Sequence, residues 1–403
     1  MVVAGVAPVP DETFVARDLD QLRSRGWEVT IRGLNQRRPA SRAAASPITC
    51  SASFYTAESR GTVGDAPPAA QIGAFLVIRG IMRRALRLWS RPMQVLALIR
   101  SRRLIERVAV DATSADLMLA HFAWLTADVA AVAARAAKKP WVCAVHAWDV
   151  FAHPPAILRA RLRDAAGVVA CSEAARQAVT AAGIPAGRVY LVHHGLPLGE
   201  YTFRSVQPDA GAPMVAVGRL ERKKGFDLLL HAFAAMTESA GAAAARLVIV
   251  GDGSERTALQ KLAQRLGLDG RVDFAGQLGH AATRCAVRAA VMLVLPSRRT
   301  RRGDRDGIAN VLIEAMALGV PVVTTTAGGA AEVIRDDVSG LLVPPDDVPA
   351  LTRALMALTT DGQRRERLAL AARAAVEEHF DARKTGLDLD LFLRAAARSP
   401  SKG

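Results

Sequence analysis

Short apolar runs alternate with amphipathic stretches along almost the whole chain. Residues 141–145, 167–170 and 214–217 have the length and composition of buried strands. Residues 127–137 and 363–379 instead show the spacing expected of helices with one apolar face. Strands and helices that alternate in this way are typical of parallel sheets covered by helices. The pattern therefore predicts an α/β protein.

The sequence RDGIANVLIEAMALG, residues 305–319, has the clearest helical period. Its apolar residues predict one buried face, and Asp306, Asn310 and Glu314 form a polar stripe on the same helix. Asp306 is placed near the helix start, where free N–H groups and the helix dipole favour an anion. The two carboxylates would lie roughly 12 Å apart, further than the ~5–9.5 Å of glycosidase pairs. A nucleotide-sugar fits this spacing; the alternative is an ordinary solvated helix.

A second candidate site follows the apolar run 214–217. Gly218 and Arg219 end this strand, and Lys224 comes five residues later, before Gly225 and a further helix. Arginine can fork onto phosphate oxygens, and lysine acts as a point charge. Together with the acidic helix, these cations predict a diphosphate site, although a basic run of this kind is usually a solvated loop. Lys223 is an adjacent alternative to Lys224.

Two further regions place polar side chains at strand ends, where α/β sheets bind ligands. His146 follows the strand 141–145, although a structural role is the commoner one for a single histidine. Glu12 and Thr13 follow the first strand, predicted at residues 2–6, and could contact an acceptor or cap a helix. His193 and His194 have no third ligand at suitable spacing, so no metal site is predicted.

Composition and charge limit the number of domains, the kinds of partner and the cellular compartment that the sequence allows. The 403 residues, 51% hydrophobic and 23% charged, are sufficient for two domains. The net charge of +15 favours acidic partners, but only 5% of residues are aromatic and none interleave with basic residues, so nucleic acid is not expected. The four cysteines form no C-x-x-C pair, which indicates buried thiols in a reducing cytosol. Without a leader or a long apolar run, a cytoplasmic protein is expected.

The segment between Arg79 and Arg107 mixes arginines with Ile, Leu and Met on a helical pattern. Such a segment can lie on an anionic membrane surface. The alternative is an ordinary pair of surface helices. The membrane interpretation would make the protein peripheral at the inner face of the plasma membrane.

Three motifs resemble those of the family 4 retaining glycosyltransferases. Residues 305–319 resemble the E-x7-E signature with Asp306 in the first position, and are followed by the small-residue turn 327–329 and Glu332. Residues 218–225 resemble G-R-[LF]-x-x-x-K-G, and residues 146–151 resemble H-x-x-D-[IV]-F. The stretch PVPDETFV is similar to the loop of bacterial exopolysaccharide enzymes. The resemblance spans nearly the whole chain and is strongest from His146 onward.

The resemblance implies the GT-B fold, in which two Rossmann-like domains face each other across a cleft and the last helix crosses back to the first domain. The expected boundaries are 1–204 for the acceptor domain, 205–213 for the linker, 214–380 for the donor domain and 381–403 for the last helix. It also implies that His146 and Asp306 contact the donor sugar, Arg219 and Lys224 bind the diphosphate, and Glu314 binds the ribose. Further donor contacts would come from Gly307, Ile308, Ala309, Asn310, Val311, Leu312, Gly276 and Leu278, and acceptor contacts from Glu12, Thr13 and Asp149.

The function implied is transfer of a sugar from a nucleotide-diphosphate sugar to an acceptor hydroxyl with retained configuration. The leaving phosphate would help to deprotonate the acceptor, and no metal or other cofactor would be needed. A glycan or lipid-linked acceptor is expected, in exopolysaccharide, glycolipid or cell-envelope glycan synthesis. Two alternatives stay open: a nucleotide-sugar epimerase or hydrolase on the same fold, and a non-catalytic subunit that binds the donor.

Overall fold

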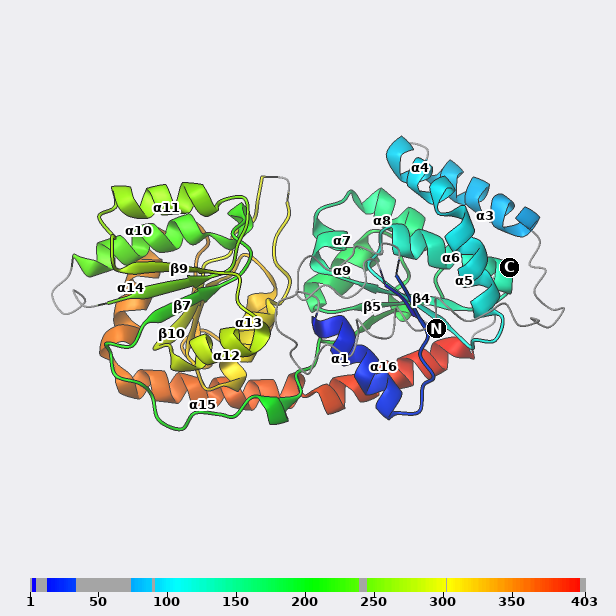
Figure 1. Ribbon diagram of the computed structural model, residues 1–403. Helices are drawn as coiled ribbons and strands as arrows, with labels where there is room; N and C mark the ends of the chain where they lie inside the picture. Colours follow the sequence, from blue (N-terminus) through cyan, green and yellow to red (C-terminus); the bar gives the residue numbers. More distant parts are fainter. Residues whose placement is uncertain are drawn as a thin grey trace.

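The computed structural model describes residues 2–4, 13–33, 74–88, 91–238, 245–301 and 303–398. These residues form two six-stranded sheets in which all strands are parallel. The two sheets lie side by side, and each is covered by its own helices (Figure 1). The prediction of two Rossmann-like α/β domains is confirmed.

The first sheet has the order β2-β1-β3-β4-β5-β6. Its central strand β4 is buried along its whole length, as its sequence WVCAV predicts. The alanine-rich helix α6 is buried at almost every position, because alanine allows a helix to approach the sheet closely. The strands are β1 (Val2–Ala4), β2 (Ile31–Gly33), β3 (Met118–His121), β4 (Trp141–Val145), β5 (Gly167–Ala170) and β6 (Val189–Leu191). The helices are α1 (Thr13–Ser24), α3 (Ala74–Arg87), α4 (Pro92–Arg100), α5 (Arg102–Ala112), α6 (Leu125–Ala137), α7 (Ala147–Phe151), α8 (Pro155–Leu162), α9 (Glu173–Ala181), η3 (Ala186–Arg188) and η4 (Leu198–Glu200).

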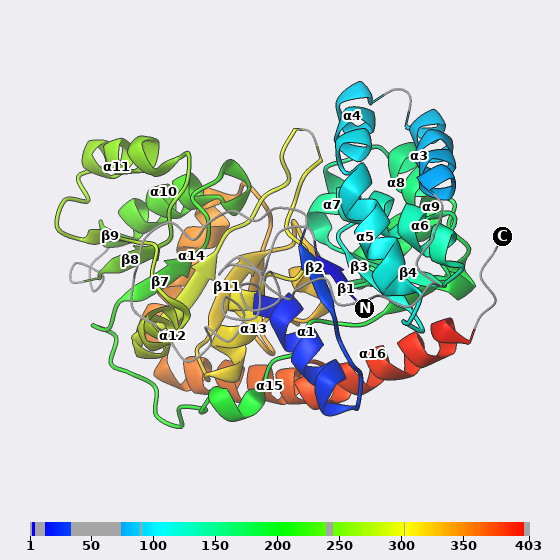
Figure 2. The same ribbon diagram turned by 45° about the vertical axis from the view of Figure 1, so that its right-hand side comes forward.

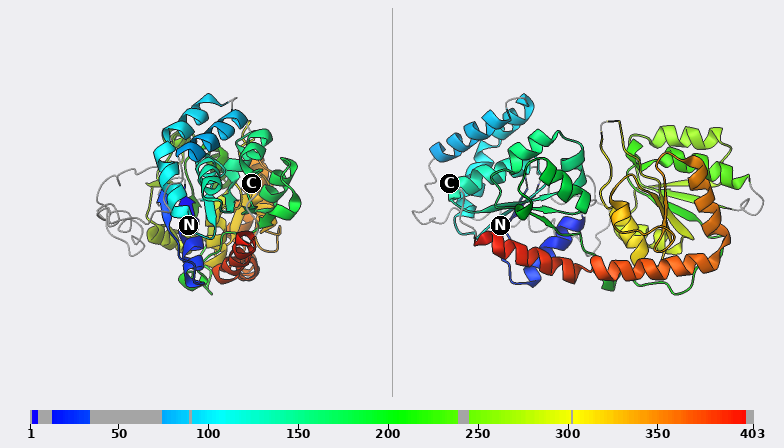
Figure 3. Two further views of the ribbon diagram at one scale, coloured as in Figure 1. Left: turned by 90° about the vertical axis from the view of Figure 1, so that its right-hand side faces the viewer. Right: turned by 180° about the vertical axis from the view of Figure 1, so that it is seen from behind.

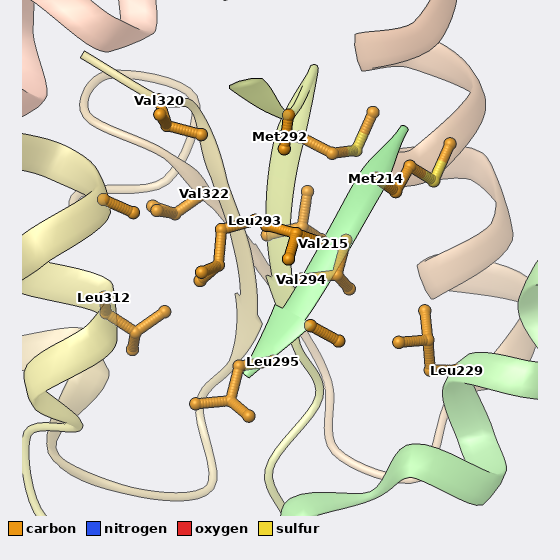
Figure 4. Packing of buried hydrophobic residues seen from close by; sticks show 14 of the residues in the cluster. Met214, Val215, Leu229, Met292, Leu293, Val294, Leu295, Leu312, Val320 and Val322 are labelled. Atoms are coloured by element: carbon orange, nitrogen blue, oxygen red, sulfur yellow. The ribbon is translucent and has the colours of Figure 1, made fainter. Parts of the chain in front are cut away.

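The second sheet has the order β12-β11-β10-β7-β8-β9. Side chains of β7 and β10 pack between Leu312 of α13 and Leu229 of α10 (Figure 4). The strands are β7 (Met214–Val217), β8 (Leu247–Val250), β9 (Val272–Gly276), β10 (Met292–Leu295), β11 (Val322–Thr325) and β12 (Leu341–Val343). The helices are η5 (Arg222–Lys224), α10 (Phe226–Thr237), α11 (Arg256–Arg265), α12 (His280–Ala289), α13 (Asn310–Ala317), η6 (Gly329–Glu332), α14 (Val348–Thr360) and α15 (Gly362–His379).

The last helix, α16 (Ala382–Ala397), returns to the first domain, as predicted. Seen from behind, α15 and α16 run one after the other along both domains (Figure 3). Helix α16 lies beside α1 (Figure 2), where Leu389 and Phe392 share a buried cluster with Leu19. Trp27 Nε1 also donates a hydrogen bond of 2.6 Å to Asp390 Oδ1.

The predicted helix over residues 305–319 is shorter than expected. Helix α13 begins only at Asn310, so Asp306 lies in the preceding loop and the predicted polar stripe does not include it. The cause is the turn at Gly328 and Gly329, which packs against the backbone of residues 306–308. A Cβ atom on Gly329 would lie 2.9 Å from the carbonyl carbon of Gly307. This packing holds the loop in a non-helical path, so the helical estimate of the carboxylate separation does not apply.

The basic segment after residue 74 forms α3, α4 and α5, which lie on the outer side of the first domain (Figure 1). One of its arginines, Arg84, is buried and donates a 2.7 Å hydrogen bond to Asp128 Oδ1 on α6. Arg161 donates to the other oxygen of the same carboxylate. Arg84 therefore anchors α3 to the core and is not available to a membrane. Among the described helices, none has the length and apolar character that crossing a bilayer requires.

Candidate active site

The loop before α13 brings a carboxylate and an ammonium group together at the carboxyl ends of β7 and β10. Lys224 Nζ lies 2.8 Å from Asp306 Oδ2, and Ser297 Oγ donates a 2.7 Å hydrogen bond to the same oxygen. Burial disfavours the charged form of Asp306, but the charge of Lys224 and these hydrogen bonds outweigh it, so the pKa lies below its ordinary value. Asp306 is therefore ionised at neutral pH.

The neighbouring cations have different surroundings. Lys223 is buried and pairs with Asp304 at 3.3 Å, so Lys224 alone of these two lysines points toward Asp306. The side chain of Arg219 is 60% exposed and is 2.8 Å from Glu221 Oε1. Arg219 can therefore turn toward a ligand without leaving a buried partner. Glycine at position 225 is required because φ is +69° and a Cβ would lie 2.0 Å from the carbonyl oxygen of Pro296.

The start of α13 lies beside this group. Ala309 is the N-cap residue, and no described side chain bonds to the free N–H groups of the first turn. Helix N-termini with free N–H groups are favourable positions for phosphate. The predicted donor-binding residues 307–312 thus form the loop that follows Asp306 and the first turn of α13.

Glu314, in the second turn of α13, is bound by groups from both domains. Arg17 of α1 donates a 3.0 Å hydrogen bond from Nη2 to Glu314 Oε1, and His280 Nε2 lies 3.4 Å from the same oxygen. Arg17 also donates to the hydroxyl of Tyr201 at 2.9 Å. Burial disfavours the ionised carboxyl of Glu314, but His280 and Arg17 outweigh this and lower its pKa. The carboxylate is charged and held in position.

Two further contacts join the domains. The carboxylate of Glu332 accepts hydrogen bonds from the backbone N–H groups of Glu173 and Ala174, at 2.6 and 2.8 Å, at the start of α9. The guanidinium of Arg305 lies over the ring of Phe151, 4.1 Å from its centre. Both contacts flank the loop that carries Asp306, so this loop lies between the domains.

His146 lies in the first domain and precedes Ala147, whose Cβ would lie 3.2 Å from a Cβ atom on Gly307 of this loop. It follows β4, is buried, and packs against the rings of Phe14 and Phe122 at centroid distances of 4.9 and 4.4 Å. Burial lowers the pKa of its imidazole well below the ordinary value, and the nearby His194 and His121 act in the same direction. His146 is therefore neutral. Its Nδ1 lies 3.3 Å from His194 Nε2, and its Nε2 has no partner among the described residues.

The predicted acceptor residues differ in their surroundings and in how far the structure describes them. Asp149 is only 1% exposed, and its Oδ2 accepts a 2.9 Å hydrogen bond from the backbone N–H of His146. The carboxylate therefore holds the start of α7, and acceptor contact by Asp149 stays a prediction. Glu12 lies outside the described residues, and Thr13 is described only as the first residue of α1. Gly276 ends β9, and Leu278 packs against the hydrophobic core of the second domain.

Sequence patterns did not indicate several residues of the site. Arg17, Tyr201, His280 and Ser297 contact Asp306 or each other around Glu314, but they come from four separate segments. None of them belongs to a local motif, so their positions depend on how segments far apart in the chain meet. The expected burial of the cysteines holds for Cys143, but Cys285 is exposed.

The carboxyl ends of adjacent strands also bring together side chains that could bind a metal. One donor atom each from His146, Cys171 and His194 lies within 4.8 Å of the others. His121, at the end of β3, lines the same cavity as these three residues and Asp18. Sequence spacing gave no third ligand for His194, because His146 and Cys171 come from the ends of other strands.

Two family models match consecutive parts of the chain. The model described as Glycosyltransferase Family 4 matches residues 12–200, and the model described as Glycosyl transferases group 1 matches residues 201–375. The boundary between the two matches falls between the two sheets.

Similar proteins carry related names. A 2-deoxystreptamine N-acetyl-D-glucosaminyltransferase of Streptomyces fradiae is 33% identical over 51% of this chain and 48% of its own length. A putative colanic acid biosynthesis glycosyltransferase of Escherichia coli is 29% identical over 53% of this chain and 52% of its own length. The chain thus spans about half the length of these curated relatives. The solved structure of Anabaena HepE in complex with UDP-glucose superimposes with a TM-score of 0.62 at 22% identity, over 80% of this chain and 96% of that one. This likeness confirms the GT-B architecture.

Proposed function

We propose that this chain transfers a sugar from a nucleotide-diphosphate sugar to an acceptor hydroxyl, because it belongs to the family 4 and group 1 glycosyltransferases. One observation carries the proposal: Lys224, Asp306 and the uncapped start of α13 lie together, with Glu314 in the second turn of the same helix. This arrangement offers positive groups to a diphosphate between two carboxylates that can bind hydroxyl groups.

The donor would lie along the loop and first turn of α13. The ribose hydroxyls would donate to Glu314, the diphosphate would face Lys224, Arg219 and the free N–H groups, and the sugar would lie between Asp306 and His146. Fixed positive groups stabilise the charge that develops on a leaving diphosphate. The UDP-glucose bound to the HepE structure supports a donor of this chemical class.

The transfer would retain the configuration of the anomeric carbon. The bond between this carbon and the diphosphate oxygen breaks, and the acceptor oxygen bonds to the same face of the sugar. The acceptor proton passes to the departing phosphate, so no protein carboxylate is needed as the base. Lys224 neutralises phosphate charge during this step, and the reaction as proposed uses no metal ion.

The acceptor is proposed to be a growing glycan or a lipid-linked sugar of an exopolysaccharide, glycolipid or envelope glycan. The colanic acid enzyme among the similar proteins supports this class. The outer face of α3 supports a peripheral position at the inner face of the plasma membrane. Phe75, Met82 and Leu86 on this face are 71, 62 and 73% exposed and lie beside the exposed Arg79 and Arg83.

The charge on this face favours an anionic surface. Arg79, Arg135 and Arg87 surround Arg83 and lower the pKa of its guanidinium, which shows that like charges are crowded there. Anionic headgroups would relieve this repulsion, and the exposed apolar side chains would enter the interfacial layer of the bilayer. A lipid-linked acceptor would then be held close to the first domain.

A thermal-shift panel of UDP-, GDP- and ADP-sugars tests the donor site. Stabilisation by one nucleotide series, lost in Glu314→Ala and Arg219→Ala, would support the proposal and identify the base. Absence of any shift would contradict it. Release of nucleotide only when an acceptor glycan is added would then separate a transferase from a hydrolase or epimerase, and binding without turnover would indicate a donor-binding subunit.

A further inference from the structure

Four neighbouring strands of the first sheet each end at a side chain that can bind a metal. In the order β3-β4-β5-β6, these are His121 at the end of β3, His146 after β4, Cys171 after β5 and His194 shortly after β6. All four side chains line one cavity. Parallel strands end at one edge of a sheet, so residues far apart in sequence converge there.

We propose that His146, Cys171 and His194 form a binding site for a thiophilic divalent metal ion, with Zn²⁺ as the expected occupant. Two imidazoles and one thiolate are ligands that Zn²⁺ prefers. Three protein ligands leave one position of a tetrahedral ion for water. Cys171 and His194 are half-buried, so an ion can enter from solvent.

The distances fit such an ion. His146 Nδ1 and His194 Nε2 are 3.3 Å apart. Two nitrogens bound to one tetrahedral Zn²⁺ at about 2.0–2.1 Å each are separated by about 3.4 Å. The sulfur and a nitrogen on the same ion would be about 3.6 Å apart, so the donor atoms, which already lie within 4.8 Å of one another, need to approach by about 1.2 Å at most. The ion would replace the hydrogen that the two rings share.

The surroundings support ligation as well. His194 Nδ1 lies 3.5 Å from Asp18 Oδ2, the arrangement in which a carboxylate orients a metal-bound histidine through its other nitrogen. Both ring nitrogens of the buried His121 have no hydrogen-bond partner among the described residues. Buried polar atoms without a partner are costly, and a water bound to the ion in this shared cavity would offset this cost.

Bound metal would fix the orientation of His146. Ligation through Nδ1 leaves the hydrogen on Nε2, which makes this nitrogen a permanent donor. The proposed transfer reaction does not require the ion, and the ion requires neither donor nor acceptor. The two proposals can therefore be tested separately.

Co²⁺ is the probe for the test, because a Co²⁺–thiolate bond gives a charge-transfer band that reports the sulfur ligand directly. Reduced, metal-free full-length protein is titrated with Co²⁺ and then with Zn²⁺. The expected result is one Co²⁺ per chain with a thiolate band, which Zn²⁺ abolishes. A titration without the band would overturn the proposal, whatever the variants do.

Variants identify the ligands. Cys171→Ser should lose the band and bind Zn²⁺ at least ~10-fold more weakly, and Asp18→Asn should keep the band but weaken binding about 10- to 100-fold. Cys285→Ser is the matched control, because this exposed thiol lies outside the site, and it should behave as wild type. Unchanged Zn²⁺ affinity in Cys171→Ser would also overturn the proposal. Melting curves without metal establish that each variant is folded.

Discussion

Arg17 Nη2 of the first domain lies 3.0 Å from Glu314 Oε1 of the second. The carboxylate proposed to bind the ribose is thus already occupied by an arginine from the opposite domain. Both side chains are largely buried, so this ion pair is shielded from solvent. A bound ribose and Arg17 would compete for the same oxygen atom.

Removal of Arg17 should strengthen nucleotide binding. In Arg17→Ala the carboxylate of Glu314 would be free for the ribose hydroxyls, and we expect a 3- to 10-fold lower Kd for the nucleotide, or ~0.7–1.4 kcal/mol. Calorimetric titration measures this. Arg23→Ala removes an exposed arginine of the same helix and should leave the Kd unchanged. Weaker binding in Arg17→Ala would show instead that Arg17 contacts the nucleotide.

Glu314 should contribute to stability in a pH-dependent way. Its pKa in the folded protein is below the ordinary 4.5, so its contribution is present above that pH and is lost as the pH falls through the folded pKa. Glu314→Gln should therefore lower the free energy of unfolding by about 1–3 kcal/mol between pH 6 and 8, and by less below pH 4. Denaturant unfolding at several pH values measures this difference.

Glu200→Gln serves as the control for that experiment, because Glu200 pairs with Arg284 but is half exposed. An exposed pair contributes less than about 1 kcal/mol. A difference between wild type and Glu314→Gln that widened toward low pH would contradict the assigned ionisation.

Lys224 should act mainly in the chemical step. Lys224→Ala removes the cation beside Asp306, and we expect kcat at saturating donor to fall by about 10²–10³ because charge on the leaving diphosphate is no longer neutralised. Arg222→Ala removes an exposed cation two residues away and should change kcat less than about twofold. Full turnover in Lys224→Ala would exclude the proposed role.

Gly329 should be indispensable to the shape of the donor site. A methyl group there would lie 2.9 Å from the backbone of Gly307 and Ile308, which cannot move without displacing the loop of Asp306. We expect Gly329→Ala to cost about 1–3 kcal/mol of stability and to weaken donor binding at least ~10-fold. Gly187→Ala, in the first domain, has open space around the added methyl group and should be neutral in both measurements. Normal donor affinity in Gly329→Ala would refute this account of the loop.

The outer face of α3 should bind anionic vesicles. Arg79→Glu with Arg83→Glu reverses two exposed charges without affecting the buried Arg84, and should reduce co-sedimentation with phosphatidylglycerol vesicles at least ~10-fold. Lys261→Glu with Arg265→Glu makes the same charge change on α11 of the second domain and should have little effect. Equal losses in both double variants would indicate attraction by net charge alone.

Local patterns predicted most of the fold. The strands Trp141–Val145, Gly167–Ala170 and Met214–Val217 have the expected bounds, and Ser172, which directly precedes Glu173, caps α9. These elements were predictable because burial on both faces of a strand and capping of a helix depend on neighbouring residues.

The same local rules failed where distant segments meet. The helical period of residues 305–319 gave no sign that the turn at Gly328 and Gly329 would hold its first residues out of the helix. The period of the arginine-rich segment likewise did not distinguish Arg84, which is buried against Asp128, from its exposed neighbours.

The sequence by itself determined the alternation of strands and helices and the segments that carry charge toward the proposed donor site, and its resemblance to a known family implied the helix that returns to the first domain. Only the tertiary structure decided that Arg17 faces Glu314, that Lys224 rather than Lys223 faces Asp306, and that His146, Cys171 and His194 meet. The reason is that hydrophobic spacing specifies which face of an element is buried, whereas a contact between side chains requires the relative positions of elements that are far apart in the chain.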